Sequence, residues 1–251
     1  MIVIENVSKS FGNKEVLHNI NVTFERGKVN LVIGRSGSGK TVLMKCLIGL
    51  LAPTEGAIYY DRRDFHHMSF DDQKMLRTDM GVVFQGSALF DSLTIEENVM
   101  FPLNMLTHQS YQEKLERVNY CLHRVDLFNT NHLYPSELSG GMKKRAAIAR
   151  AIAINPKYLF CDEPNSGLDP KTSLIIDELI TGITHEYNMT TIVNTHDLNS
   201  VITTGETIAF IKDGFLEWRG TKEEVMVSNS ENLNDFIYAQ PITQMIREQM
   251  K

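Results

Sequence analysis

The sequence predicts an α/β fold in which a mostly parallel β-sheet is covered by helices on both faces. Three short and mainly apolar runs, each the length of one strand, carry this prediction: Tyr158–Cys161, Thr190–Thr195 and Thr207–Ile211. Continuous apolar runs of this length are typical of strands buried on both faces of a parallel sheet. Segments with helical periodicity alternate with them, and this alternation favours crossover connections between parallel strands.

The other predicted elements extend this pattern along the chain. A helical middle, about Thr94–Ile154, interrupts the β-rich parts and is interpreted as an inserted subdomain. From about Ser230 to Lys251 we expect an amphipathic helical tail, broken at Pro241 because proline lacks a backbone N–H. Its apolar faces are expected to dock on a protein surface, either that of a second copy or that of the chain's own preceding domain. Further strands are predicted at Ile2–Val7, Val22–Glu25, Val29–Ile33, Ala57–Tyr60 and Gly81–Phe84, and helices at about Thr41–Leu51, Tyr111–Val125, Met142–Ile154 and Pro170–Tyr187.

Composition and charge narrow the classes of protein to consider. The formal net charge of the 251 residues is -6 and there is no long Lys/Arg run, which argues against a nucleic-acid partner. The N-terminus lacks the features of a signal peptide, and the most apolar stretch, Val42–Ala52, is too short to cross a bilayer. We therefore expect a soluble protein that a partner must hold at any membrane. Cys46, Cys121 and Cys161 are widely spaced and are expected to be buried small hydrophobic residues.

A glycine-rich motif follows the predicted strand Val29–Ile33 and opens the next helix. Glycines let the backbone curl so that successive N–H groups point at phosphate oxygens, and the helix N-terminus adds its positive dipole end. The lysine places a cation on the β- and γ-phosphates of a nucleotide, and the final hydroxyl is a ligand for Mg²⁺. The sequence therefore predicts a P-loop that binds ATP with Mg²⁺. The motif residues are Gly34, Arg35, Ser36, Gly37, Ser38, Gly39, Lys40 and Thr41.

Two adjacent carboxylates end the predicted strand Tyr158–Cys161. Asp162 is expected to hold Mg²⁺ directly or through water. Glu163 comes one residue later and is expected to act as the general base for the attacking water. Neighbouring residues of an extended chain point apart, so the two carboxylates divide these roles.

A second candidate anion cradle lies between the P-loop and the Asp-Glu pair. Ser139, Gly140 and Gly141 offer a hydroxyl and bare N–H groups at the start of a predicted helix. The sequence Leu138-Ser139-Gly140-Gly141 at this place resembles the signature of ABC ATPases. The resemblance implies that the cradle meets the γ-phosphate bound by a second copy of the chain, in a head-to-tail dimer.

Other residues keep to the order of that family. By resemblance, Gln85 is the glutamine that senses Mg²⁺ and water and faces the transmembrane partner. Asp169, in Ser166–Asp169, belongs to the loop that lies against the partner's P-loop, and His196 is the histidine that contacts the γ-phosphate. Phe11 stands where the family has an aromatic that stacks on adenine. There are two departures: Met142 stands where most members have Gln, and Val42 where many have a second Ser or Thr.

The resemblance implies a P-loop NTPase fold with a mostly parallel core sheet, an N-terminal antiparallel β subdomain and an inserted α-helical subdomain. The corresponding domains are an ABC ATPase domain over residues 1–229, with the helical subdomain at about 86–156, and a helical tail over residues 230–251.

The signature helix also suggests a subgroup. Lys143 and Lys144 after Met142, together with the stretch Ser87–Thr94, look most like the ATPase of the maintenance-of-lipid-asymmetry (Mla) phospholipid transporters. This resemblance implies permease subunits and a periplasmic lipid-binding subunit as partners, with the chain peripheral at the cytoplasmic face of the inner membrane. The ATPase of an amino-acid importer shares much of this stretch and stays open as an alternative.

Functions outside transport also remain open at this stage. One is a non-transport ABC ATPase, although the missing basic patch argues against a role in nucleic-acid repair. Another is a nucleotide-binding regulator without turnover, which would have no need of Glu163 and His196. A P-loop kinase would not need the signature sequence.

We predict that Lys40→Ala abolishes nucleotide binding or hydrolysis without unfolding the chain. Lys40 is expected in an exposed loop, and its loss removes a charge-assisted contact of about 2 kcal/mol or more. Calorimetry with ATP measures the effect, and unchanged affinity together with unchanged turnover would reject the P-loop assignment.

Overall fold

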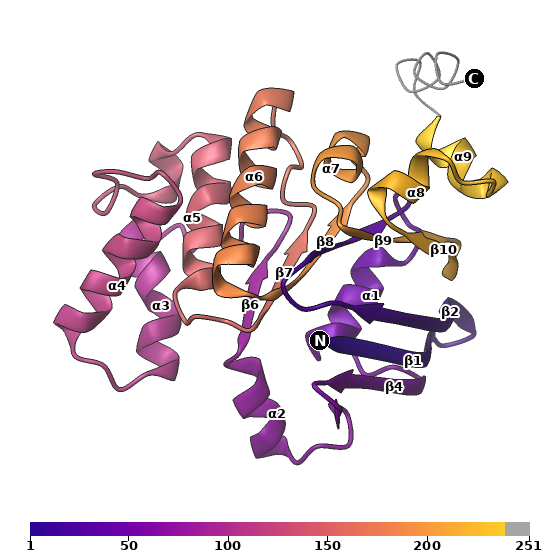
Figure 1. The fold of residues 1–251 in the computed structure, drawn as a ribbon. Coiled ribbons are helices and arrows are strands. Elements are labelled where there is room, and N and C mark those ends of the chain that lie inside the picture. The colour runs from indigo at the N-terminus through magenta and orange to yellow at the C-terminus, as the bar shows by residue number, and fades with distance from the viewer. Residues whose placement is uncertain (239–251) are drawn as a thin grey trace. The chain divides into compact units, whose positions relative to one another are not determined.

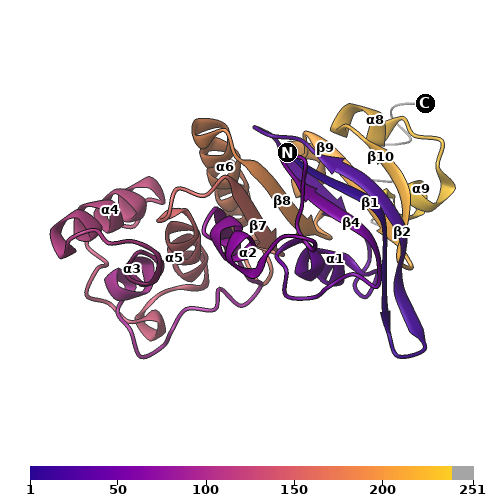
Figure 2. The same ribbon diagram turned by 90° about the horizontal axis from the view of Figure 1, so that it is seen from below.

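A computed structural model describes residues 1–238 (Figures 1 and 2). The chain folds into two compact units. Unit 1 comprises Met1–Glu25, Val29–His67 and the chain from Asn194 onward, and unit 2 comprises Arg26–Lys28 and Met68–Val193. Both units are therefore assembled from segments that lie far apart in the sequence.

Unit 1 contains an antiparallel sheet and part of the parallel core. The antiparallel sheet has the order β2-β1-β4-β5, and its long β1–β2 ribbon extends well past the predicted strands Ile2–Val7 and Val22–Glu25. In the other group of strands, β3 pairs with β9 in parallel and β9 pairs with β10 antiparallel. The strands are β1 (Ile2–Phe11), β2 (Lys14–Phe24), β3 (Val29–Ile33), β4 (Glu55–Tyr60), β5 (Arg63–Asp64), β9 (Thr207–Lys212) and β10 (Phe215–Gly220).

Unit 1 has four helices among its described residues: α1 (Lys40–Leu47), α7 (Leu198–Thr203), α8 (Lys222–Met226) and α9 (Glu231–Ile237). The predicted extension of the first helix to Leu51 is wrong. Gly49 has a φ of 75°, in the left-handed region, and the N–H groups of Leu50 and Leu51 both turn back to the carbonyl of Lys45. The glycine thus ends the helix early, as glycines commonly do.

The first part of the predicted tail is α9, which packs on unit 1 itself. Ser230 caps the helix by accepting from the N–H of Leu233, and Leu233, Phe236 and Ile237 are buried. The Phe236 ring lies 5.3 Å from the ring of Phe210 in β9. The apolar residues Ile242, Met245 and Ile246, which were also expected to dock, and the break at Pro241, lie outside the described residues.

Unit 2 holds the rest of the buried strands. β6 (Met80–Val83) and β7 (Tyr158–Asp162) are parallel, with Met80 opposite Tyr158, and the strand order is β8-β7-β6. β8 (Thr190–Thr195) is buried throughout, and its last two residues pass into unit 1. The burial of Tyr158–Cys161 in β7 and of all of β8 agrees with the apolar runs that predicted these strands.

The helices of unit 2 begin at the residues that their capping patterns favour. Thr94 and Ser110 form capping boxes with Glu97 and Glu113, and Asp169 caps a helix whose first residue is proline. Figures 1 and 2 show α3, α4 and α5 side by side. The helices are α2 (Phe70–Arg77), α3 (Ile95–Leu106), α4 (Tyr111–Arg124), α5 (Gly140–Ile152) and α6 (Pro170–Tyr187), with a 3₁₀ turn at Pro135–Glu137.

Within residues 1–238, the helices all fall short of the length and apolar content that a bilayer crossing needs. Cys46, Cys121 and Cys161 are free and buried, as the sequence predicted.

We predict that Phe236→Ala lowers the free energy of unfolding by about 3 kcal/mol, because it opens a cavity between α9 and β9. Thermal and denaturant unfolding measure the change. Phe70→Ala is the matched control, since that ring is 76% exposed and its removal should change stability little. Equal, small effects of the two substitutions would mean that α9 is not packed on β9.

Candidate active site

The P-loop of unit 1 joins β3 to α1 as the sequence predicted. Gly34, Gly37 and Gly39 have φ values of 150°, 82° and 107°, which residues with a side chain rarely adopt. A Cβ atom on Gly34 would lie 2.2 Å from the carbonyl oxygen of Ile211 in β9, and one on Gly39 would lie 2.8 Å from Leu17 in β2. The loop is therefore pressed against β9 at Gly34 and against β2 at Gly39, and neither of these two positions has space for a side chain.

Lys40 does not lie in an exposed loop, so that expectation is wrong. Lys40 is the first residue of α1 and is only 5% exposed. Its ammonium donates to the carbonyl oxygens of Gly34 at 2.8 Å and Arg35 at 3.0 Å. The side chain is buried because the loop curls around it and offers two acceptors to the desolvated charge.

The donor groups of the P-loop fit a polyphosphate. The hydroxyl of Ser38 is buried and has no hydrogen-bond partner among the described residues. Gly39 stands at the N-cap of α1 without any side-chain cap, so the first N–H groups of the helix are left for a ligand. Thr41 is exposed one residue beyond Lys40. A hydroxyl in need of a partner, open helix N–H groups and a buried cation together suit an anionic ligand with several oxygens.

Two further predicted residues also belong to unit 1. Phe11 is the last residue of β1 rather than a residue after the strand, and its ring is 47% exposed, with the Lys9 ammonium 5.2 Å from its centroid. His196 is exposed and follows β8 directly. Two residues earlier, the amide of Asn194 donates to the sulfur of Met44 in α1 at 3.8 Å, which ties the end of β8 to the helix that starts at Lys40.

In unit 2 the structure brings Gln85 and Glu163 together. The Gln85 side-chain amide donates to Oε2 of Glu163 at 3.3 Å and to the hydroxyl of Ser166 at 3.2 Å. Asp162 is the last residue of β7, whereas Glu163 has a φ of 47° and so leaves the strand in the left-handed region. The backbone therefore changes direction between the two carboxylates, in a conformation that residues other than glycine adopt uncommonly.

Two basic side chains of α5 hold the loop that carries Gln85, and the sequence analysis assigned neither of them a role. The Lys144 ammonium donates to the backbone carbonyl of Gln85. The Arg150 guanidinium donates to the carbonyls of Ser87 at 2.9 Å and Ala88 at 2.7 Å. No sequence signal revealed these bonds, because they join residues about 60 positions apart.

The signature residues begin α5. Ser139 caps the helix by accepting from the N–H of Met142 at 3.3 Å, and a Cβ on Gly141 would lie 2.7 Å from Thr172 in α6. A hollow of about 500 Å³ lies here, lined by Ser139, Gly140 and Gly141 together with Asp169. Hydrogen bonds from Thr172 to the Asp169 carboxylate lower the pKa of that group and keep it ionised as the cap of α6.

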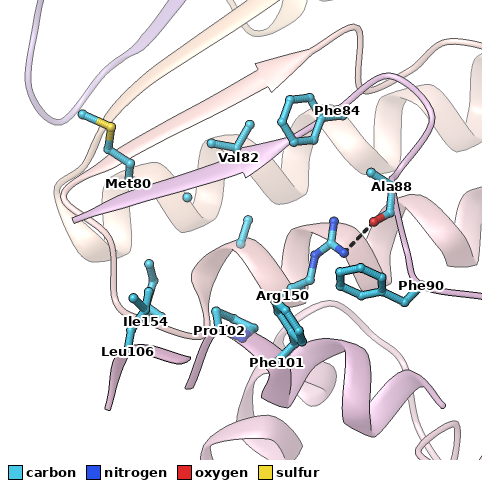
Figure 3. A pocket seen from close by; sticks show the side chains of 12 residues that line it. Met80, Val82, Phe84, Ala88, Phe90, Phe101, Pro102, Leu106, Arg150 and Ile154 are labelled. Carbon is cyan, nitrogen blue, oxygen red and sulfur yellow. Dashed lines mark hydrogen bonds between the residues drawn. The ribbon is translucent and has the colours of Figure 1, made fainter. Parts of the chain in front are cut away.

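An apolar cavity of about 460 Å³ lies between β6, α3 and α5 (Figure 3). Four large apolar side chains at its edge, Phe84, Phe90, Phe101 and Leu106, are each 38–43% exposed. Figure 3 shows Arg150 at its wall with its bond to Ala88. An exposed apolar patch of this kind in a protein marks an interaction surface.

The fold and these motifs define an ATP-binding cassette, and a family model agrees. The model described as ABC transporter matches residues 17–166, which is more than half of the chain. The chain therefore belongs to the ABC transporter family and carries that family's ATPase cassette.

Curated relatives from several transport systems are similar to this chain. The intermembrane phospholipid transport system ATP-binding protein MlaF of Haemophilus influenzae is 35% identical, over 94% of this chain and 90% of MlaF. The methionine import ATP-binding protein MetN of Clostridium tetani is 37% identical, over 99% of this chain and 85% of MetN. The probable ribonucleotide transport ATP-binding protein mkl of Mycobacterium tuberculosis is 34% identical over 94% of this chain. The match spans only 66% of the length of mkl.

A solved structure is also similar. The dimeric ATP-binding cassette MJ0796, in a post-hydrolysis state bound to ADP and Pi, has a TM-score of 0.80 and 34% sequence identity over 88% of this chain and 99% of that one.

We predict that Gly34→Ala and Gly37→Ala differ sharply, although both glycines have positive φ. Gly34→Ala forces a Cβ against the Ile211 carbonyl, whereas a Cβ on Gly37 would meet nothing within 4 Å. Gly34→Ala should abolish ATP binding and cost about 2 kcal/mol more stability than Gly37→Ala, since overpacking adds to the shared backbone strain. Calorimetry with MgATP and thermal unfolding measure both effects. Equal losses in the two variants would show that the contact with β9 does not shape the loop.

Proposed function

We propose that this chain is the ATP-binding and ATP-hydrolysing subunit of an ABC transporter and that it drives a separate transmembrane permease. The observation that carries this proposal is the Glu163 carboxylate, which stands directly after β7 and Asp162 and accepts a hydrogen bond from Gln85. A pure nucleotide-binding module has no need of a carboxylate held in this way.

The P-loop is proposed to bind the phosphates of ATP. The N–H groups of Gly34, Arg35, Ser36, Gly37, Ser38 and Gly39 and the Ser38 hydroxyl supply donors, and Lys40 supplies the positive charge. Thr41, Asp162 and Gln85 provide the oxygen atoms that suit Mg²⁺. Bound Mg²⁺ would neutralise charge on the phosphate oxygens.

Three more side chains complete the proposed chemistry. Glu163 accepts a proton from the attacking water, and the Gln85 amide keeps the carboxylate in place. His196, exposed after β8, contacts the γ-phosphate. The exposed ring of Phe11 stacks on adenine.

A second copy of the chain is proposed to complete each nucleotide site. Ser139, Gly140 and Gly141 offer their N–H groups at the start of α5, and the hollow that they line with Asp169 faces solvent in the single chain. The dimeric form of the similar cassette MJ0796 supports the formation of a dimer.

The apolar cavity beside β6 is proposed to receive a cytoplasmic segment of the permease. Phe84 immediately precedes Gln85, so a segment seated against Phe84 and Phe101 would touch the loop that carries a proposed Mg²⁺ ligand. Figure 3 shows both rings directed toward the cavity. This would join permease binding to the hydrolysis site and hold the chain at the cytoplasmic face of the inner membrane.

For the transported molecule we propose a phospholipid, in an Mla-type complex with a periplasmic lipid-binding subunit. The match to 90% of MlaF and the Lys143-Lys144 pair after the signature support this choice. The similarity to MetN favours an amino-acid importer as the second candidate. Purification of the tagged chain from its native membranes distinguishes them. A permease with a lipid-binding subunit is expected, a permease with an amino-acid-binding subunit would favour the importer, and no permease would favour a non-transport ABC ATPase.

We predict that Glu163→Gln binds ATP, hydrolyses it about 10²- to 10⁴-fold more slowly and accumulates as an ATP-bound dimer. The substitution keeps the shape of the side chain but removes the proton acceptor and a negative charge near the γ-phosphate. Light scattering at high protein concentration with millimolar MgATP measures the dimer, and phosphate release measures turnover. Turnover at the unmodified rate would place the base elsewhere.

Adding Ser139→Arg to Glu163→Gln tests the dimer separately. The bulky side chain would fill the proposed cradle, so the double variant should stay monomeric while its P-loop still binds ATP. Dimerisation equal to that of Glu163→Gln alone would contradict the head-to-tail arrangement.

A further inference from the structure

The two adjacent lysines of the signature helix lie in very different surroundings. Lys143 is half-buried, whereas Lys144 is only 5% exposed. Burying a lysine costs free energy unless the ammonium finds hydrogen-bond partners. Nothing in the proposed function so far gives Lys144 a role.

The partner of Lys144 is the backbone of Gln85. The ammonium donates to the Gln85 carbonyl, while the side chain of the same glutamine donates to Oε2 of Glu163 at 3.3 Å and to Ser166 at 3.2 Å. Gln85 is thus held from both sides. Lys144 of α5 binds its main chain, and Glu163 and Ser166, which follow β7, bind its side chain.

The rest of the loop depends on α5 as well. Ser87 and Ala88 have φ values of 63° and 48°, an uncommon conformation for residues with a side chain. Arg150 satisfies both of their carbonyls. Arg150 therefore stabilises the turn after Gln85, whereas Lys144 is the side chain of α5 that binds Gln85 itself.

The charge of Lys144 also acts on the candidate base. Burial lowers the pKa of the Lys144 ammonium, and the negative charge of the Glu163 carboxylate opposes this by raising it. The ammonium and the Glu163 carboxylate therefore attract each other, in surroundings where water screens the attraction poorly.

We propose that Lys144 is a positioning residue for ATP hydrolysis, which fixes the main chain of Gln85 from the signature helix so that the glutamine amide stays on Glu163. This inference rests on the proposed roles of Gln85 and Glu163. Because α5 begins one residue after Ser139, a shift of the signature helix is transmitted through Lys144 to the Gln85 loop. A second copy that engages Ser139 of the first chain would thereby act on Glu163 of that first chain.

Steady-state ATPase measurements on the full chain with its permease test the proposal. Lys144→Met keeps the length of the side chain but removes the donor and the charge. We expect kcat to fall about 10- to 100-fold, as misplacement of a catalytic group does, with the KM for MgATP unchanged. Lys144→Arg keeps a cation with donors and should restore most of the rate. If Lys144 had a purely structural role, its replacement would lower thermal stability but would not lower kcat while leaving the KM for MgATP unchanged.

Lys157→Met is the matched control. Lys157 is another lysine of unit 2, paired with Asp79 at 2.9 Å at the opposite end of β7 from Glu163. Its loss changes the net charge equally and should leave kcat unchanged. If Lys144→Met does not fold, Lys144→Gln carries the same expectation, because glutamine is one bond shorter and loses the contact with the Gln85 carbonyl.

A double-mutant cycle with Gln85→Ala decides whether Lys144 acts through the glutamine. The double variant should be no slower than the slower single variant, since each change by itself releases the Gln85 amide from Glu163. Two outcomes would overturn the inference, provided that Gln85→Ala and Glu163→Gln are slow. One is a wild-type kcat in Lys144→Met or Lys144→Gln, and the other is rate losses that multiply in the double variant. If Gln85→Ala and Glu163→Gln themselves kept the wild-type rate, the proposed function would fail instead.

Discussion

The close approach of the P-loop to β9 at Gly34 is the constraint on which unit 1 depends. The loop can pass the Ile211 carbonyl only because residue 34 has no side chain. The same contact is secured by backbone hydrogen bonds, from the Gly214 N–H to the Ser38 carbonyl at 3.0 Å and from the His18 N–H to the Gly214 carbonyl at 2.9 Å. The turn between β9 and β10 therefore links the loop to β2. Through Phe210 and Phe236, α9 supports the same strand from its own side.

Unit 2 is organised around one helix rather than one loop. α5 starts at the signature; its Lys144 donates to the Gln85 carbonyl, and its Arg150 donates to the carbonyls of Ser87 and Ala88 in the same loop. A single helix thus carries the proposed contact with a second copy and the anchors of the loop next to the apolar cavity. A rigid helix is suited to this purpose because its ends cannot move independently.

Both units bury a lysine and satisfy it on backbone carbonyls of a loop. Lys40 and Lys144 are each 5% exposed. Holding a cation away from water costs free energy, but a charge fixed in advance needs little reorganisation when a reaction creates negative charge nearby. Lys40 is the residue proposed to meet the phosphates directly. Lys144 contacts the carbonyl of Gln85, and its proposed effect on the reaction passes through that residue.

The local features of the fold could be predicted from the sequence. The strands Val29–Ile33 and Thr190–Thr195 and the helix Pro170–Tyr187 have the predicted bounds, because burial pattern and capping are written in neighbouring residues. The P-loop follows its strand and opens its helix as its motif requires. The roles of these motif residues remain proposals.

Three features emerge only from the three-dimensional fold: the burial of Lys40, the bond between Gln85 and Glu163, and the contact of Lys144 with Gln85. The fold also revealed β10, whose alternating exposed and half-buried residues gave no continuous apolar run. The physical reason is that a side chain's burial and partners are set by segments distant in the sequence, whereas periodicity, caps and glycine-rich turns reflect interactions within a few residues.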